Sequence, residues 1–296
     1  MYDIIVIGAG PAGMTAAIYG RRASKSVLLL EARSFGGQII NAHRIENYPA
    51  EPGISGVDYA MKLYDQTNAL GAEFKFERAL SIRDGEVKTV VTASGEYQAK
   101  TVIIATGSDN GKLGLPNEAE LTGRGVSYCA TCDGAFFKGK TVAVAAGNAK
   151  AYSDAVYLSD IAQTVYLIDR DPNGGEDQTE GRDNIKVISD SRVTKLIADK
   201  RLTAIEVTDS RGGSCEIELD GLFVSVGRVP ENQSFEELID LDSNGYAASE
   251  ENCLTRTAGI FVAGDNRAKT LRQLVTAASD GAVAATQAVK YIAARK

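Results

Sequence analysis

The succession of apolar and polar stretches predicts a strand, a helix and a second strand over residues 2–31. An apolar run from Ile4 to Ile7 is followed by a glycine-rich stretch, then by a helical pattern that reaches about Ala23. A second apolar run, Val27 to Leu30, ends at Glu31. Continuous short apolar runs on either side of a helix are typical of a parallel βαβ unit whose strands are buried on both faces.

The same pattern returns after Lys140. A strand is predicted from Thr141 to Ala145 and another from Val165 to Ile168, ending at Asp169. The helix between them has small or apolar residues at Ala151, Ala155, Leu158 and Ala162. Because Ala146 precedes Asp169 by the same 23 positions that separate Gly8 from Glu31, we predict an α/β fold with two Rossmann-like halves.

The first glycine-rich stretch has the spacing of a dinucleotide site. It reads Gly8-Ala9-Gly10-Pro11-Ala12-Gly13. In such a loop Gly8 makes the tight turn, Gly10 leaves room for a pyrophosphate, and Gly13 lets the helix approach the strand. The helix N-terminus then offers free N–H groups to the phosphates, and Glu31 stands where a carboxylate accepts hydrogen bonds from a ribose.

The second loop departs from this spacing. Ala146 and Asn148 stand where the first and second glycines are expected, on either side of Gly147. A side chain at the second position hinders close approach of the backbone to a phosphate, although Lys150 could compensate as a point charge. Asp169-Arg170-Asp171 should disfavour NADP more than NAD, and residues 172–181 read as an exposed loop.

Composition narrows the class of protein. The 296 residues carry a net charge of −7 and no basic block, which argues against binding to nucleic acid or to an anionic membrane. The 30 glycines fit nucleotide binding. There is no signal-peptide pattern and no apolar run of transmembrane length, so we expect a cytoplasmic location.

Cys129 and Cys132 form a C-x-x-C pair, which can be a redox dithiol or half of a zinc site. Cys215 and Cys253 stand alone and His43 is the single histidine, so we expect no metal. Asp133 could act as proton donor and acceptor for a thiolate, or it could be a helix N-cap or turn acid. Cys215 lies in an alternating pattern typical of a half-buried strand, which suggests a structural role.

The chain resembles the low-molecular-weight, FAD-containing thioredoxin reductases of bacteria. The resemblance rests on GAGPAG near the start, Glu46-Asn47-Tyr48-Pro49, the GRGVSYCATCDG block, and GIFVAGD followed by RQL near the end. It implies a second Rossmann-like domain inserted into the first. The FAD domain would comprise residues 1–110 and 237–296, and the dithiol domain residues 111–236.

The resemblance also implies roles for individual residues. Cys132 would exchange electrons with the flavin, Cys129 with the disulfide of thioredoxin, and Asp133 would act as acid and base. The implied FAD contacts are Gly8, Ala9, Gly10, Pro11, Ala12, Gly13, Glu31, Gly37, Gln38, Asn47, Thr106, Gly107, Gly264, Asp265, Arg272, Gln273 and Leu274. A homodimer is usual in this family.

The altered second loop changes the expected electron donor. The pattern is similar to that of the ferredoxin-dependent flavin thioredoxin reductases, in which the nicotinamide site is lost. We therefore expect ferredoxin to supply the electrons. The alternatives are a nicotinamide donor with NADH preferred over NADPH, another carrier such as a reduced deazaflavin, a dithiol oxidase that uses O₂, and a non-enzymatic module on a relic fold.

Two basic segments could dock an acidic ferredoxin. Residues 21–25 read RRASK, for which a solvated helix end is the simpler interpretation. Arg267, Lys269 and Thr270 precede the predicted flavin-facing helix and could border a docking site. His43 is expected in a surface loop.

Overall fold

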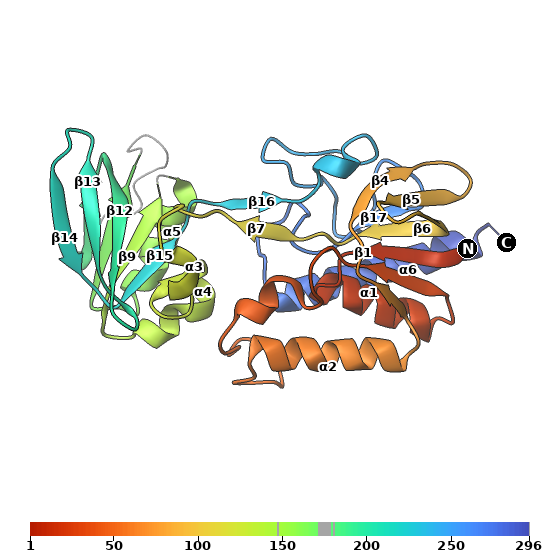
Figure 1. Ribbon diagram of the computed structural model, residues 1–296, viewed down its shortest axis with the longest axis horizontal. Coiled ribbons are helices and arrows are strands. Elements are labelled where there is room, and N and C mark those ends of the chain that lie inside the picture. Colours follow the sequence, from red (N-terminus) through yellow and green to blue (C-terminus); the bar gives the residue numbers. More distant parts are fainter. Residues whose placement is uncertain (147, 171–178, 180, 296) are drawn as a thin grey trace. The chain divides into compact units, whose positions relative to one another are not determined.

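The chain divides into two compact units in the computed structural model, which describes residues 1–146, 148–170, 179 and 181–295 (Figure 1). Unit 1 comprises Met1–Asp109 and Val229–Lys296, and unit 2 comprises Asn110–Arg228. Unit 2 is therefore inserted into unit 1 along the sequence. The chain passes between the units within β7 (Ser108–Asn110) and β16 (Arg228–Pro230), which pair with each other.

Unit 1 is built on a seven-stranded sheet of order β3-β2-β1-β6-β5-β4, with β17 also paired to β6. Its strands are β1 (Tyr2–Ile7), β2 (Val27–Leu30), β3 (Glu73–Lys75), β4 (Ala79–Arg83), β5 (Lys88–Thr92), β6 (Glu96–Ile104) and β17 (Ile260–Val262). Its helices are α1 (Pro11–Arg22), α2 (Gly56–Ala69) and α6 (Leu274–Ala293), with 3₁₀ turns η1 (Gly37–Asn41) and η3 (Gln233–Phe235). The strands β3, β2, β1, β6 and β17 run parallel, while β4 and β5 are antiparallel additions.

Both faces of β1 are buried, which explains its uninterrupted apolar run. Ile4 and Val6 belong to a core shared with α1 and α6, while Ile5 and Ile7 belong to the core on the opposite face. Helices α1 and α6 pack closely because Gly281 has no side chain. A Cβ at that position would overlap the backbone of Ala12. The packing thus fixes α6 against the helix that follows the first glycine-rich loop.

Unit 2 contains a parallel sheet of order β11-β10-β9-β15-β8 and an antiparallel sheet of order β12-β13-β14. The strands are β8 (Val126–Ser127), β9 (Thr141–Ala146), β10 (Thr164–Asp169), β11 (Ile185–Ile188), β12 (Ser191–Ala198), β13 (Leu202–Asp209), β14 (Ser214–Glu218) and β15 (Gly221–Val224). The helices are α3 (Glu118–Leu121), α4 (Ala130–Asp133) and α5 (Ala149–Ser159), with a 3₁₀ turn η2 (Gly134–Phe137).

The parallel sheet of unit 2 separates two cores. Val142 and Val144 of β9 pack with the buried face of α5, whereas Ala143 and Ala145 face the antiparallel sheet. This arrangement confirms the predicted α/β class and its second Rossmann-like unit. The division into an FAD domain and a dithiol domain stays a prediction. Within the described residues no helix is long and apolar enough to cross a membrane.

Candidate active site

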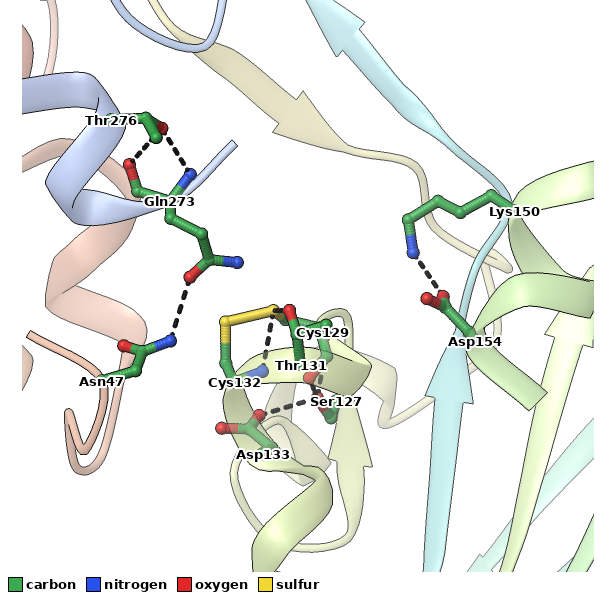
Figure 2. The surroundings of a disulfide bond; sticks show 10 residues. All are labelled: Asn47, Ser127, Cys129, Thr131, Cys132, Asp133, Lys150, Asp154, Gln273 and Thr276. Carbon is green, nitrogen blue, oxygen red and sulfur yellow. Dashed lines mark hydrogen bonds and ion pairs between the residues drawn. A yellow bond between two sulfur atoms is a disulfide. The ribbon is translucent and has the colours of Figure 1, made fainter. Parts of the chain in front are cut away.

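Cys129 and Cys132 form a disulfide at the start of α4, after the turn that follows β8 (Figure 2). Their Cα atoms lie 5.3 Å apart. Cys129 is the N-cap residue of α4, and its Sγ accepts a hydrogen bond from the N–H of Cys132 at 3.2 Å. Strand β8 pairs in parallel with β15, so the pair follows the carboxyl end of a strand in a buried sheet. A C-x-x-C disulfide on such a turn is accessible to thiol–disulfide exchange.

Asp133 follows the pair directly and is largely buried. Burial raises the pKa of its carboxyl, and a hydrogen bond from Ser127 partly opposes that rise. The Oγ of Ser127 donates to Oδ2 of Asp133 at 2.7 Å (Figure 2). Asp133 precedes η2 but makes no side-chain cap bond to it. An acid whose pKa is raised by burial holds its proton more readily than an exposed carboxyl, and can therefore act as a proton donor and acceptor.

The loop between β1 and α1 brings together the predicted phosphate-binding residues. Gly8 has a φ of +104°, a left-handed conformation that favours glycine. A Cβ on Gly13 would overlap the carbonyl of Gly8, so this glycine sets the approach of α1 to the loop. A Cβ on Gly10 would meet only the Cα of Gly37, at 3.9 Å. The surface at Gly10 is therefore open, as a diphosphate requires.

The N-terminus of α1 has no side-chain cap. Gly10 is its N-cap residue and Pro11 its first residue. Because the first N–H groups of a helix have no partner within the helix, they and the helix dipole favour an anion at this end. The residues present thus fit the diphosphate of a dinucleotide.

Glu31 reaches back to the same loop from the end of β2. Its Oε2 accepts a hydrogen bond from Ala9 N–H and its Oε1 from Arg33 N–H, both at 2.7 Å. Each carboxylate oxygen can accept a second hydrogen bond, so these bonds orient Glu31 and leave it able to accept further hydrogen bonds. That Glu31 accepts a hydrogen bond from a ribose hydroxyl stays a prediction.

A cleft of about 320 Å³ opens beside this loop. Gly8, Glu31 and Thr106 line it, together with residues after β3 and after β16. The Thr106 hydroxyl is buried without a partner among the described residues. An unsatisfied buried hydroxyl is a ready contact for a polar ligand group. Gly107 beside it has a φ of +71°.

Gly264 and Asp265 follow β17, at the same end of the sheet as the β1–α1 loop. The N–H of Gly264 donates to Oδ2 of Asp280 at 3.0 Å. Asp280 also accepts from Nε of Arg267 and from Nζ of Lys269. Burial raises the pKa of Asp280, but these bonds outweigh it and hold that pKa below its usual value. The turn is thus tied to α6.

The residues before α6 form a hydrogen-bonded entrance to that helix. The Thr276 hydroxyl accepts from the N–H of Gln273, and Oε1 of Gln273 accepts from Nδ2 of Asn47 at 3.1 Å (Figure 2). Leu274 is the first residue of α6. Arg272 uses its guanidinium to bond the carbonyls of Asp265 and Arg267 and to lie over the Tyr246 ring, so it supports the turn.

Two further predicted contacts lie in η1. Gly37 has a φ of +58°, and a Cβ there would come within 3.2 Å of the Cα of Gly10. Gln38 donates from Nε2 to Asp109 at 2.7 Å. The predicted contacts of the first part of the chain, from Gly8 to Gly107, and those around Gly264 are therefore all carried by unit 1.

In unit 2 the N-terminus of the corresponding helix is capped by a side chain. Oδ1 of Asn148 accepts a hydrogen bond from the N–H of Ala151 at 3.0 Å and so caps α5. Lys150 forms an ion pair with Asp154 in the same helix (Figure 2). That Lys150 compensates for the missing glycine stays a prediction, since its half-exposed ammonium is paired with Asp154. Gly147, Asp171 and the predicted loop 172–181, apart from Thr179 and Gly181, lie outside the described residues.

The acid at the end of β10 is engaged as well. Asp169 is fully buried, and the Tyr152 hydroxyl donates to its Oδ2 at 2.6 Å. A ribose would have to compete with this internal bond. In unit 1 the helix end is open and Glu31 lines a cleft, whereas in unit 2 the helix end is capped and Asp169 is enclosed.

Comparison with known proteins agrees with these features. Residues 2–281 match the model of the pyridine nucleotide-disulphide oxidoreductases. The sequence is 41% identical over 300 residues to the thioredoxin reductase of Listeria innocua, covering 99% of this chain and 94% of the relative. It is 40% identical over 300 residues to that of Bacillus subtilis, covering 99% and 95%. The chain belongs to the thioredoxin reductase family.

Solved structures carry the same fold. The thioredoxin reductase of Streptococcus pyogenes has a TM-score of 0.94 and 37% identity, with 99% of each chain covered. A ferredoxin-flavin thioredoxin reductase from Clostridium acetobutylicum has a TM-score of 0.56 and 30% identity, covering 99% of this chain and 98% of that one. Membership of the ferredoxin-dependent group is not supported by overall similarity, since the Listeria and Bacillus relatives are more similar in sequence.

Thioredoxin reductases of this family are FAD-binding flavoproteins, which agrees with the open loop of unit 1. Two sequence-based interpretations of this thioredoxin reductase need correction. Arg267 is 2% exposed and Lys269 is nearly as buried, so neither borders a docking surface: both neutralise Asp280. Cys215 is exposed on β14, although Ile217, two positions later on the same face of that strand, is buried.

Two functional residues escaped the sequence analysis of this reductase. Ser127 bonds Asp133, and Asp280 holds the Gly264 turn. A serine two positions before the first cysteine carries no signal by itself. Asp280, by contrast, lies among the small and apolar residues of α6. A charged residue in such a helix indicates a buried partner of opposite charge. His43 is exposed in a loop, as expected.

Proposed function

We propose that this flavoprotein reduces the disulfide of thioredoxin through the Cys129–Cys132 pair. The observation that carries the proposal is the disulfide on the β8–α4 turn with the buried carboxyl of Asp133 next to it in sequence. Exchange needs an accessible C-x-x-C pair and a group that moves a proton to or from sulfur. Both are present on one short turn.

The electrons and protons of this reaction balance within the two dithiols. Cys129 attacks one sulfur of the thioredoxin disulfide, whose second sulfur leaves as a thiolate and takes a proton. Cys132 then attacks Cys129, which releases the first thioredoxin sulfur and closes the enzyme disulfide. Two electrons and two protons pass to thioredoxin. Asp133 is proposed to supply and recover the proton at sulfur.

When bound in unit 1 and reduced by the electron donor, FAD would supply the two electrons that return the enzyme disulfide to the dithiol. We propose that Gly10, Gly37 and the N-terminus of α1 hold its diphosphate and that Glu31 orients its ribose. Thr106, Asp265 and the entrance of α6 at Gln273 are proposed to hold the rest of the cofactor. Asn47 and Arg272 would act by supporting that entrance, through the hydrogen bonds described above.

For the electron donor we propose a one-electron carrier of the ferredoxin class in place of NADPH. Three features of unit 2 favour this donor: Asn148 caps α5, Lys150 is paired with Asp154, and Asp169 is enclosed by Tyr152. The anion-binding end of a Rossmann helix is therefore used internally. The Clostridium acetobutylicum relative bears the name of this donor.

Two other activities make different use of the same residues. A nicotinamide would have to displace the Asn148 cap, and NADH would be preferred over NADPH because Asp169 is negative. A dithiol oxidase would take electrons from a small dithiol and pass them to O₂. The overall similarity to proteins named thioredoxin reductase favours a protein disulfide as the substrate over a small dithiol.

Anaerobic titration of the FAD-loaded protein with each donor tests the proposal. Reduced ferredoxin should bleach the flavin band and produce two thioredoxin thiols per two electrons, while NADPH and NADH should bleach it slowly or not at all. The Cys132→Ser variant should still bleach with ferredoxin yet form no thioredoxin thiols. Rapid bleaching by NADPH would rule out the proposed donor. Fast O₂ consumption with a small dithiol, and no thioredoxin thiols, would favour the oxidase.

Location and assembly are part of the proposal. A thioredoxin reductase needs a reducing compartment for its product, so we propose that it acts in the cytoplasm. We also propose a homodimer, in line with the resemblance. Size-exclusion chromatography with light scattering of the FAD-loaded protein distinguishes a mass near twice 31.4 kDa from a monomer.

A further inference from the structure

We propose that Ser127 is a positioning residue for the reaction, holding the Asp133 carboxyl in the orientation in which it exchanges a proton with sulfur. The inference rests on the proposed function, since it assigns a helper to the acid of that site. It concerns a residue outside the cysteine motif, on the strand that precedes it.

The geometry of the Ser127 hydroxyl carries the inference. Its Oγ donates to Oδ2 of Asp133 at 2.7 Å and accepts from the N–H of Cys129 at 3.1 Å (Figure 2). The Cys129 carbonyl lies farther from the hydroxyl, at 3.4 Å. A hydroxyl has one proton to donate, so the shorter contact directs it to the carboxyl. The Oγ of Ser127 thus links the backbone N–H of Cys129, the attacking cysteine, to the carboxyl of Asp133.

Burial makes this contact effective. Ser127 is buried on β8, where its backbone is fixed by pairing with Phe223 of β15. The carboxyl of Asp133 is also largely shielded from water, and a hydrogen bond to a charged group is stronger where water cannot replace it. The Ser127 hydroxyl therefore both stabilises the charged carboxylate of Asp133 and fixes the orientation of that carboxylate.

Few other groups near Asp133 can influence the pKa of its carboxyl. Helix α5 and the 3₁₀ turn η2 pack near α4. A Cβ on the adjacent Gly134 would lie 3.1 to 3.5 Å from the side chains of Tyr157 and Leu158 of α5 and of Ile161, which follows that helix. Among these the Tyr157 phenol is the one titratable group, and the cysteine pair lies on the same turn as Asp133. The pKa of Asp133 departs from its usual value through burial and through Ser127 alone. Removal of the serine hydroxyl should therefore raise the pKa of Asp133 further, because nothing then opposes the effect of burial.

The test is an infrared titration of the FAD-loaded, oxidised protein. The C=O band of the protonated carboxyl of Asp133 is assigned by its absence in Asp133→Asn. In Ser127→Ala the midpoint of that band should move to higher pH, and Ser127→Thr, which keeps the hydroxyl, should restore it. An unchanged midpoint in Ser127→Ala overturns the proposal. This readout does not depend on any electron donor or on thioredoxin.

A second readout is the rate at which the pre-reduced protein forms thioredoxin thiols as a function of pH. In Ser127→Ala the limb that Asp133→Asn abolishes should move to higher pH. The maximal rate should fall by up to about tenfold because the carboxyl is no longer held in place, less than the hundredfold order expected for Asp133→Asn. Tyr128→Phe is the matched control. It removes a neighbouring hydroxyl that bonds Glu118 at 2.8 Å and should leave the limb in place.

The outcomes separate the two proposals. If the infrared midpoint moves in Ser127→Ala but the wild-type dithiol reduces no thioredoxin, the hydroxyl tunes the acid but the proposed function fails. If thioredoxin is reduced and Ser127→Ala and Tyr128→Phe shift the rate profile equally, the effect comes from general disturbance of β8 and the inference fails. Circular dichroism of each variant checks its folding.

Discussion

The side chain of Asn148 accepts a hydrogen bond from the N–H of Ala151 at 3.0 Å, where α5 begins in unit 2. Its Nδ2 also donates to the carbonyl of Ser225 at 3.0 Å, so one amide links the helix to the end of β15. The corresponding helix of unit 1 begins at Gly10 with no side-chain cap. The two Rossmann-like units therefore differ at the atoms that a phosphate would contact.

Replacement of Asn148 should affect stability in a graded way. We expect Asn148→Ala to lower the free energy of unfolding by about 1 kcal/mol, because the cap is lost, whereas glycine at an N-cap costs only a few tenths. Urea unfolding followed by circular dichroism measures both. Equal stability of Asn148→Ala and the wild type would mean that the cap does not stabilise α5. Asn148→Gly also serves as a probe for any recovered response of the flavin to NADPH.

Gly13 and Gly10 should respond differently to alanine. Gly13→Ala forces a methyl group into the carbonyl of Gly8, so we expect lower thermal stability even without cofactor. Gly10→Ala has room in the apoprotein but covers the open surface of the loop. It should fold normally and bind FAD at least tenfold more weakly, as measured by flavin fluorescence. Normal FAD affinity of Gly10→Ala would place the diphosphate elsewhere.

The buried carboxylate of Asp280 should contribute strongly to the stability of unit 1. Asp280→Asn leaves Arg267 and Lys269 without their full counter-charge in a buried site, and we expect a loss of about 3 kcal/mol or more. Asp240→Asn is the matched control, since its ion pair with Arg256 is exposed and should contribute less than about 1 kcal/mol. Guanidinium unfolding of both variants measures the difference. Similar losses would show that the cluster is not specifically important.

The raised pKa of Asp133 predicts a pH dependence of stability. Its folded-state pKa lies above the unfolded value, so the folded state binds more protons between the two values. The contribution of Asp133 to stability is therefore largest at low pH and is lost as the pH rises through its folded pKa. Asp133→Asn removes this loss. The difference in unfolding free energy between the variant and the wild type should grow in favour of the variant as the pH rises over that interval.

Local patterns in the sequence were sufficient to predict the repeated βαβ units, the glycine-rich turn after the first strand and the paired cysteines. The run from Ile4 to Ile7 is buried on both faces, and the strand spans predicted around it differ from the structure by two residues or fewer. Chain spacing dictates these features: a C-x-x-C pair on a helical turn and a glycine at a turn need no distant partner.

Contacts between distant positions could be decided only by the tertiary structure. Arg267 and Lys269 read as surface cations in the sequence, yet folding brings them to Asp280 in the interior of unit 1. The sequence offers Lys150 as a point charge for a phosphate, and only the folded helix places Asp154 one turn away in an ion pair with it. A charge has no fixed environment along a chain, because burial and partners arise only when strands and helices pack. The sequence by itself therefore determined which chemistry this protein carries, and packing decided which charged groups remain available for it.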